Sequence, residues 1–182
     1  MEFIVPRKSN DNIHPDILFI LEIIYKYNGF ICKNLNKEIE GKDYCACSFE
    51  LRNQFIRFRI AKITPSKAGQ FVTLWKRIDG GSILPFDMAD RIDSFIVSVR
   101  SGKNFGLFMF PKNVLHIKGF VSKDGIGGKR AMRLYPPWDI ALNQQAQKTQ
   151  KWQLMYFVEI LPNIDIIGMK RLFCFENTII TQ

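Results

Sequence analysis

Near the N-terminus, apolar residues recur at the spacing of an α-helix. They are Ile17, Leu18, Leu21, Ile24 and Tyr25. Asp16 places a negative charge in the first turn, and Asn28-Gly29 supplies the kind of glycine that ends helices. The pattern therefore predicts a helix that starts near His14 and ends at Asn28-Gly29, followed by a polar segment over residues 33–43.

The middle of the chain alternates between polar and apolar positions, as half-buried strands do. Phe55, Arg57 and Arg59 fall on one face of the segment 55–63, and Ile56, Phe58 and Ile60 fall on the other. A short turn at residues 52–54 separates this segment from a second strand candidate at 44–51, which predicts a β-hairpin. Further strands are predicted over 70–77, 93–100, 105–110 and 129–135. The segment 105–110 is apolar enough to be a central strand that is covered on both faces.

The remaining segments predict loops, a short turn of helix and a late helix. Loops are expected at 64–69 and in the glycine-rich stretch 122–128, and residues 114–121 predict a helical turn followed by a strand. Asp139 is expected to cap a helix that runs to Tyr156, and residues after 160 are expected to pack as an extension. Together these elements predict an α+β (mixed α/β) protein of one domain, with about five to seven strands and helices at the ends.

Composition narrows the class of protein further. The 182 residues suit one domain, and no apolar run approaches the roughly 18 residues that a membrane helix needs. The first residues lack the basic flank of a signal peptide, so we expect a cytoplasmic protein with no membrane partner. Four cysteines without a C-x-x-C pair and two isolated histidines predict reduced thiols and no metal site.

The net charge of +9 is concentrated in the middle of the chain. Residues 1–50 carry −2, residues 51–158 carry +12 and residues 159–182 carry −1. Such a block attracts polyanions, which makes nucleic acid or a nucleotide the expected partner. A solvated basic surface without a ligand is the alternative.

Two stretches supply the candidate binding residues. The first lies between Glu50 and Asp79, contains seven basic residues and no acidic one, and has aromatic residues among them. The second begins in the glycines at 125–128 and ends at Trp138. As phosphate- or nucleic-acid-binding residues we predict Arg59, Lys62, Lys67, Gln70, Lys129, Arg130 and Arg133. As base-stacking residues we predict Trp75, Tyr135 and Trp138.

Four separated segments, 59–77, 105–112, 128–139 and 148–153, resemble the motifs of the MepB family and follow the same order. The resemblance implies a core over residues 44–158, preceded by an N-terminal helical extension (1–43) and followed by a C-terminal extension (159–182). It also implies a central mixed sheet flanked by helices, similar to the restriction-endonuclease core. It implies no particular reaction, because one fold serves many functions.

The nuclease pattern, an aspartate at a strand start and an acid-x-Lys triplet on the next strand, is incomplete here. Asp93 starts a strand, but Phe110 stands where the acid before Lys112 should be. We therefore expect a binding protein without a cofactor, on a degenerate nuclease-like fold. One alternative is a Mg²⁺-dependent phosphodiesterase that uses Glu50, Asp93 and either Lys62 or Lys112. Another is an interaction module for an acidic protein.

Overall fold

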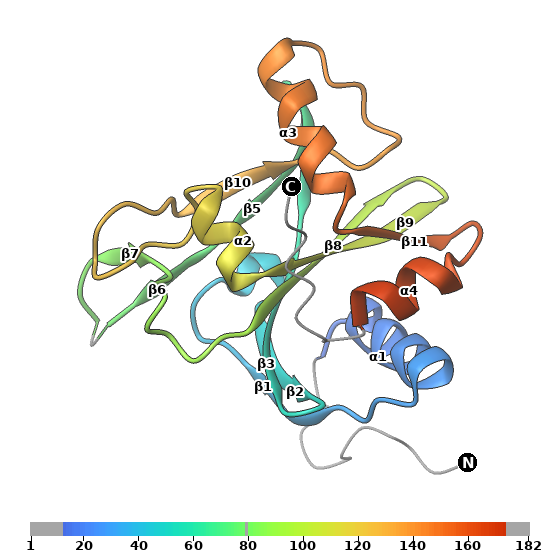
Figure 1. The fold of residues 1–182 in the computed structure, drawn as a ribbon, viewed down its shortest axis with the longest axis horizontal. Coiled ribbons are helices and arrows are strands. Elements are labelled where there is room, and N and C mark those ends of the chain that lie inside the picture. Colours follow the sequence, from blue (N-terminus) through green and yellow to red (C-terminus); the bar gives the residue numbers. More distant parts are fainter. Residues whose placement is uncertain (1–12, 79, 174–182) are drawn as a thin grey trace.

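A six-stranded mixed sheet forms the centre of the molecule (Figure 1). The structure is a computed structural model, and it describes residues 13–78 and 80–173. In spatial order the strands are β1 (Lys33–Lys37), β2 (Cys47–Leu51), β3 (Gln54–Ile60), β8 (Ser94–Ser101), β9 (Asn104–Pro111) and β11 (Phe157–Leu161). Only the β3–β8 pair within this sheet is parallel.

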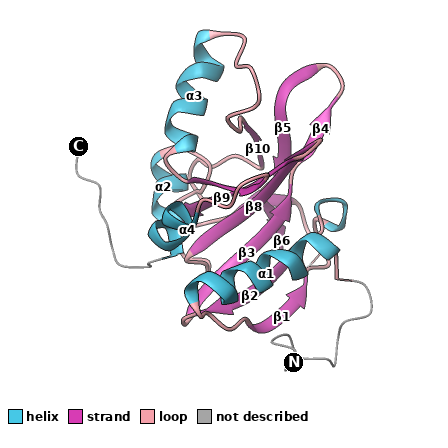
Figure 2. Ribbon diagram, turned by 90° about the vertical axis from the view of Figure 1, so that its right-hand side faces the viewer, coloured by secondary structure: helices cyan, strands magenta, loops and turns pink. Residues whose placement is uncertain are grey.

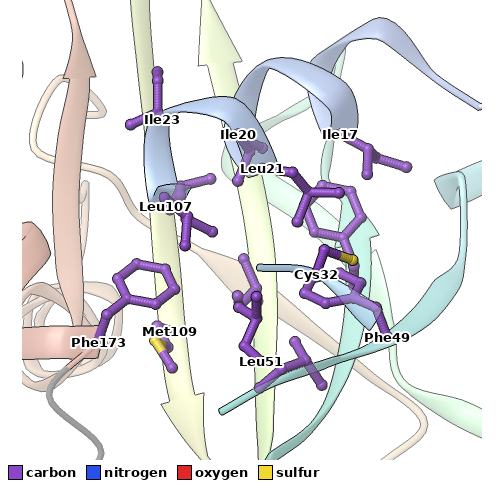
Figure 3. Packing of buried hydrophobic residues seen from close by; sticks show 14 of the residues in the cluster. Ile17, Ile20, Leu21, Ile23, Cys32, Phe49, Leu51, Leu107, Met109 and Phe173 are labelled. Atoms are coloured by element: carbon purple, nitrogen blue, oxygen red, sulfur yellow. The ribbon is translucent and has the colours of Figure 1, made fainter. Parts of the chain in front are cut away.

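Two helices cover one face of the central sheet. They are α1 (Pro15–Asn28) and α4 (Ile166–Phe173), which pack side by side (Figures 1 and 2). The Nδ1 atom of His14 caps α1 by accepting the Asp16 N–H, and Gly29 ends the helix with φ 69°. Figure 3 shows the resulting core, which combines side chains of α1, Leu107 and Met109 of β9, and Phe173 of α4.

A smaller sheet and two helices form a second layer on the other face. The small sheet has the order β10 (Ala131–Leu134), β5 (Lys67–Thr73) and β4 (Lys62–Thr64). The helices are α2 (Lys112–Ile117) and α3 (Gln144–Leu154). Val72 and Leu134 of the small sheet pack with Val97 and Phe108 of the central sheet in a second apolar cluster. The short strands β6 (Trp75–Arg77) and β7 (Ile83–Pro85) form a separate ribbon.

The architecture confirms the predicted α+β class and the single domain with a central mixed sheet. The first helix and the β2–β3 hairpin also form as predicted. The predicted extensions join the same sheet, because β1 comes from the segment before residue 44 and β11 crosses residue 158. None of the helices in the described part of the chain is long and apolar enough to cross a membrane.

Several local predictions differ from the structure. Strand β1 lies in the segment predicted to be merely polar, because four of its five residues are exposed at a sheet edge and only Leu35 is buried. The strand predicted over 70–77 is split at Leu74, where the chain leaves the three-stranded sheet and enters the β6–β7 ribbon. The predicted loop at 64–69 is reduced to a tight turn at residues 65–66, because residues 67–69 already belong to β5.

The last third of the chain also departs from the pattern. The cap of the late helix is Asn143 rather than Asp139, because the side chain of Asn143 accepts the Ala146 N–H and the helix begins at Gln144. Residues 118–121, where a strand was expected after α2, form a turn instead. The extension after residue 160 contains α4, and its Met169 is fully buried. Residues 174–182 of that extension lie outside the described residues.

Candidate nucleic-acid interface

The outer surface of the small sheet places cations and an aromatic ring in one row. Lys62 and Arg133 are the register partners of Phe71, one on each side of it. Because successive side chains alternate, Val72 and Leu134 point inward and are buried, whereas the row faces outward. Lys62 is exposed, and Phe71 and Arg133 are half-buried.

A second aromatic ring lies beside this row. The Tyr44 ring centroid is 6.3 Å from that of Phe71, and Lys62 Nζ is 5.1 Å from the Tyr44 centroid. Burial, and after it the charge of Asp43, raises the pKa of Tyr44, so its hydroxyl stays protonated at neutral pH. We call Tyr44, Lys62, Lys67, Phe71 and Arg133 the basic-aromatic face.

Arg133 holds the edge of this face in shape. Its Nη1 donates to Thr64 Oγ1 at 2.9 Å and to the Gly69 carbonyl at 3.0 Å. Its guanidinium carbon lies 5.8 Å from the Phe71 ring centroid. The side chain therefore fixes the β4–β5 turn and keeps a positive charge beside the half-buried Phe71 ring.

Tyr135, which the sequence predicts to stack on a base, lies close to the same turn. It is half-buried, and a Cβ added to Gly69 would lie 2.8 Å from its ring, so the ring packs directly on the glycine. Gly69 also has φ 80°, a conformation that only glycine adopts without strain. The structure thus brings Lys62, Lys67, Arg133 and Tyr135 to one region of the small sheet.

Two of the predicted phosphate ligands lie inside the protein. Arg59 is 1% exposed, donates to the Phe58 carbonyl and forms an ion pair with Glu38 at 2.5 Å. Gln70 is also 1% exposed and exchanges two hydrogen bonds with the backbone of Arg100. Neither side chain is open to a phosphate in this structure, because other chain segments cover them. Over Arg59, the covering segment includes Gly41, whose added Cβ would lie 3.3 Å from Arg59 Nε.

The other candidates are distributed over separate surfaces. Lys129 and Arg130 are exposed just before β10, and Lys129 Nζ lies 5.2 Å from the Phe120 ring. Trp75 is half-buried on the β6–β7 ribbon. Trp138 packs edge-on against Phe157 at 5.6 Å, and its indole N–H is buried without a partner among the described residues. The three predicted stacking residues therefore do not form one platform.

The candidate carboxylates flank a single residue. Glu50 is the register partner of Phe55, and Asp93 Oδ2 accepts the Phe55 N–H at 2.8 Å. Lys112 Nζ instead donates to the carbonyls of Met88 and Asp90, at 2.8 Å each. Over residues 13–78 and 80–173, there is no group of three or more His, Cys, Asp or Glu side chains placed to hold a metal ion.

The glutamines of the late motif have structural contacts. Gln153 is fully buried, accepts the Tyr135 N–H and donates to the Arg133 carbonyl, both at 2.9 Å. Gln150 donates to the carbonyls of Pro136 and Asp139, at 3.1 and 2.9 Å. Helix α3 is thereby attached to the strand that carries Arg133.

Sequence reasoning missed Tyr44, Phe71 and Glu38 as parts of this region. Phe71 alternates with Val72 in a strand, so the sequence identified it only as one of several interleaved aromatic residues. Tyr44 is in one turn of 3-10 helix (Lys42–Tyr44), and its approach to Phe71 depends on the tertiary fold. Glu38 precedes the predicted core and meets Arg57 and Arg59 only after folding.

The fold and this region define a single-domain α+β protein with a basic-aromatic face. The sequence pattern of the MepB-like family matches residues 38–159, so the chain belongs to that family. The crystal structure of MepB is similar to this one, with a TM-score of 0.71 and 31% sequence identity over 82% of this chain and 99% of the MepB chain. The comparison with curated proteins gives no match.

Proposed function

We propose that this protein binds single-stranded nucleic acid, or a nucleotide, on the basic-aromatic face. The observation that carries the proposal is the row of Lys62, Phe71 and Arg133 across three adjacent strands, with Tyr44 beside it. Aromatic rings between cations bind single strands, because bases stack on the rings while the cations contact phosphates.

Among the described residues, no acidic side chain forms an ion pair with the cations of this face. Within the described residues, the ion pairs involve Arg57, Arg59, Lys76, Arg77 and Arg100. Lys62 and Lys67 are exposed and have no acidic partner there. Binding to them releases counterions from the nucleic acid, so affinity should fall as salt concentration rises.

Fluorescence anisotropy tests the proposal with a labelled oligothymidylate, its duplex and the matching RNA strand. The double variant K62A/K67A should weaken binding and reduce the log–log salt slope by about 1.4, since each lost phosphate contact on a single strand changes it by roughly 0.7. The control variant K103A removes an exposed lysine from the β8–β9 turn.

The variant F71L separates stacking from charge, because it keeps an apolar side chain and removes the ring. Its affinity should fall about fivefold or more with the salt slope unchanged. Equal binding by wild type, F71L and K62A/K67A would refute the proposal. Binding of an acidic protein in place of every nucleic acid would instead favour the interaction-module alternative.

A Mg²⁺-dependent phosphodiesterase is the second candidate function. The observation in its favour is that Glu50 and Asp93 lie on either side of Phe55. Gels of the same binding mixtures, with Mg²⁺ or with a chelator, test it. Cleavage that disappears in D93N would support it, and intact oligonucleotides under all conditions would refute it.

A further inference from the structure

A polar pocket lies on the face of β1, β2 and β3 that is opposite to α1. Its volume is about 270 Å³, and its lining includes Asn36, Ser48, Glu50, Phe55, Arg57 and Arg91. The register places Asn36, Ser48 and Arg57 side by side on three strands, and it places Glu50 beside Phe55. Arg91 comes from the segment before β8 and closes the pocket over Phe55.

The pocket offers hydrogen-bond donors from one residue and an acceptor from another. The guanidinium carbon of Arg91 lies 3.6 Å from the Phe55 ring centroid. Arg91 has no ion pair with an acidic side chain among the described residues. Glu50 accepts one hydrogen bond, from Asn34 at 3.0 Å, which leaves its second oxygen free within the described structure. Arg57, in contrast, is neutralised by Glu38 at 2.7 Å.

The Glu50 carboxylate and the Arg91 guanidinium both line the pocket beside the Phe55 ring. These two groups suit a flat ligand that carries a pair of hydrogen-bond donors next to a pair of acceptors. Guanine is such a ligand, because its N1–H and N2–H groups are adjacent donors and its O6 and N7 are adjacent acceptors. Adenine has neither donor of that pair, because its N1 is an acceptor and its C2 carries only a hydrogen atom. The free oxygen of Glu50 and the oxygen bound to Asn34 can accept the donors, and Arg91 can donate to O6 and N7.

A second, wider hollow borders Glu50. Its volume is about 570 Å³, and Glu50 lines both spaces. Two of its lining residues, Lys33 and Arg52, are exposed cations. Positive charge therefore lies near the pocket, where it attracts the phosphates of a bound strand.

We infer that this pocket selects guanine, held by Glu50 and Arg91, among the bases of a bound strand. The inference rests on the proposed function for the source of the base, because single-stranded regions present splayed bases whose edges proteins can bind. The segment that carries Glu38 and Tyr44 borders both sites, since Glu38 pairs with Arg57 of the pocket and Tyr44 packs on Phe71 of the basic-aromatic face.

Two binding measurements on the full chain test the inference. The first is calorimetry with GMP, IMP, which lacks the N2 amino group, and AMP. The second compares a labelled oligothymidylate with the same strand carrying one central dG. GMP should bind about tenfold or more tightly than IMP and AMP, and the single dG should raise affinity by a similar factor.

The variant E50Q replaces an acceptor oxygen with a donor and should abolish the preference for GMP and for dG. The control E40Q removes an acidic residue that pairs with Arg77 outside the pocket and should retain both preferences.

Binding of the strand without a dG preference would overturn the inference and leave the proposed function standing. GMP binding that depends on Glu50, without binding of any strand, would overturn the proposed function and leave the pocket as a site for the free nucleotide. Equal preferences in E50Q and wild type would overturn the inference.

Discussion

Removal of the charge of Glu38 should destabilise the protein strongly. Glu38 forms ion pairs with Arg59 at 2.5 Å and with Arg57 at 2.7 Å. The Arg59 side chain is 1% exposed and the Glu38 side chain 10%, so water replaces little of the lost interaction. E38Q preserves the shape of the side chain and leaves the buried guanidinium without a counter-charge.

The expected loss follows from these burials. Removing one partner of a buried ion pair costs about 3–5 kcal/mol. The Arg57 pair adds little, because that side chain is 32% exposed and exposed pairs contribute roughly 0–1 kcal/mol. The glutamine amide can still accept one hydrogen bond, so we expect the lower end, about 3 kcal/mol. For a chain of this size that lowers Tm by about 6–12 °C.

Urea denaturation measures the change, since urea, unlike guanidinium chloride, does not screen charges. E40Q is the matched control, because Glu40 pairs with Arg77 at 3.1 Å and both side chains are 35% exposed. E40Q should lose less than about 1 kcal/mol. The double variant E38Q/R59M should recover part of the loss, since it removes the unpaired charge. A loss in E38Q that equals the loss in E40Q would refute the reasoning.

Three further predictions concern packing, titration and buried hydrogen bonds. G106A should cost about 1–3 kcal/mol in urea denaturation, because the new Cβ would lie 2.3 Å from the Phe157 ring, and F157L in addition should restore part of it. Hydrogen bonds from the Ala89 N–H, the Ser122 hydroxyl and the Gly125 N–H hold the pKa of Asp87 below its usual value. Its contribution to stability is thus present above about pH 3.9 and is lost as pH falls below it, so D87N should flatten the acid limb of stability against pH. Q153L leaves the Tyr135 N–H and the Arg133 carbonyl unpaired and should cost about 2–4 kcal/mol, with faster hydrogen exchange at the Tyr135 amide.

The buried thiols should be unreactive toward alkylating agents while the protein is folded. Burial raises the pKa of Cys32 to about 12 and raises that of Cys47 as well, so neither forms a thiolate at neutral pH.

Local patterns were enough to predict the elements whose partners are close in sequence. The capping residues and the apolar spacing define α1, and the alternation on both sides of a short turn defines the β2–β3 hairpin. Strand β1 escaped prediction because it is an edge strand that buries only Leu35, so its sequence has no alternation to detect. The start of α3 was predicted four residues too early, because Asn143 rather than Asp139 supplies the cap.

The candidate site was predictable in composition and only partly in geometry. The sequence correctly placed Arg57 and Arg59 on the same face of one strand. It did not show that the segment containing Gly41 folds over Arg59, which turns an apparent phosphate ligand into a buried partner of Glu38. The same limit applies to Gln70, whose contact with Arg100 joins residues 30 positions apart.

The sequence by itself determined the α+β class, the family and the excess of positive charge in residues 51–158, because these depend on composition and on patterns within short segments. Only the tertiary structure decided which cations stay exposed. The register of β4, β5 and β10 aligns Lys62, Phe71 and Arg133, and the order of β1, β2 and β3 assembles the pocket around Glu50. The physical reason is that the exposure of a polar side chain depends on what packs over it, and that contact comes from residues distant in the sequence.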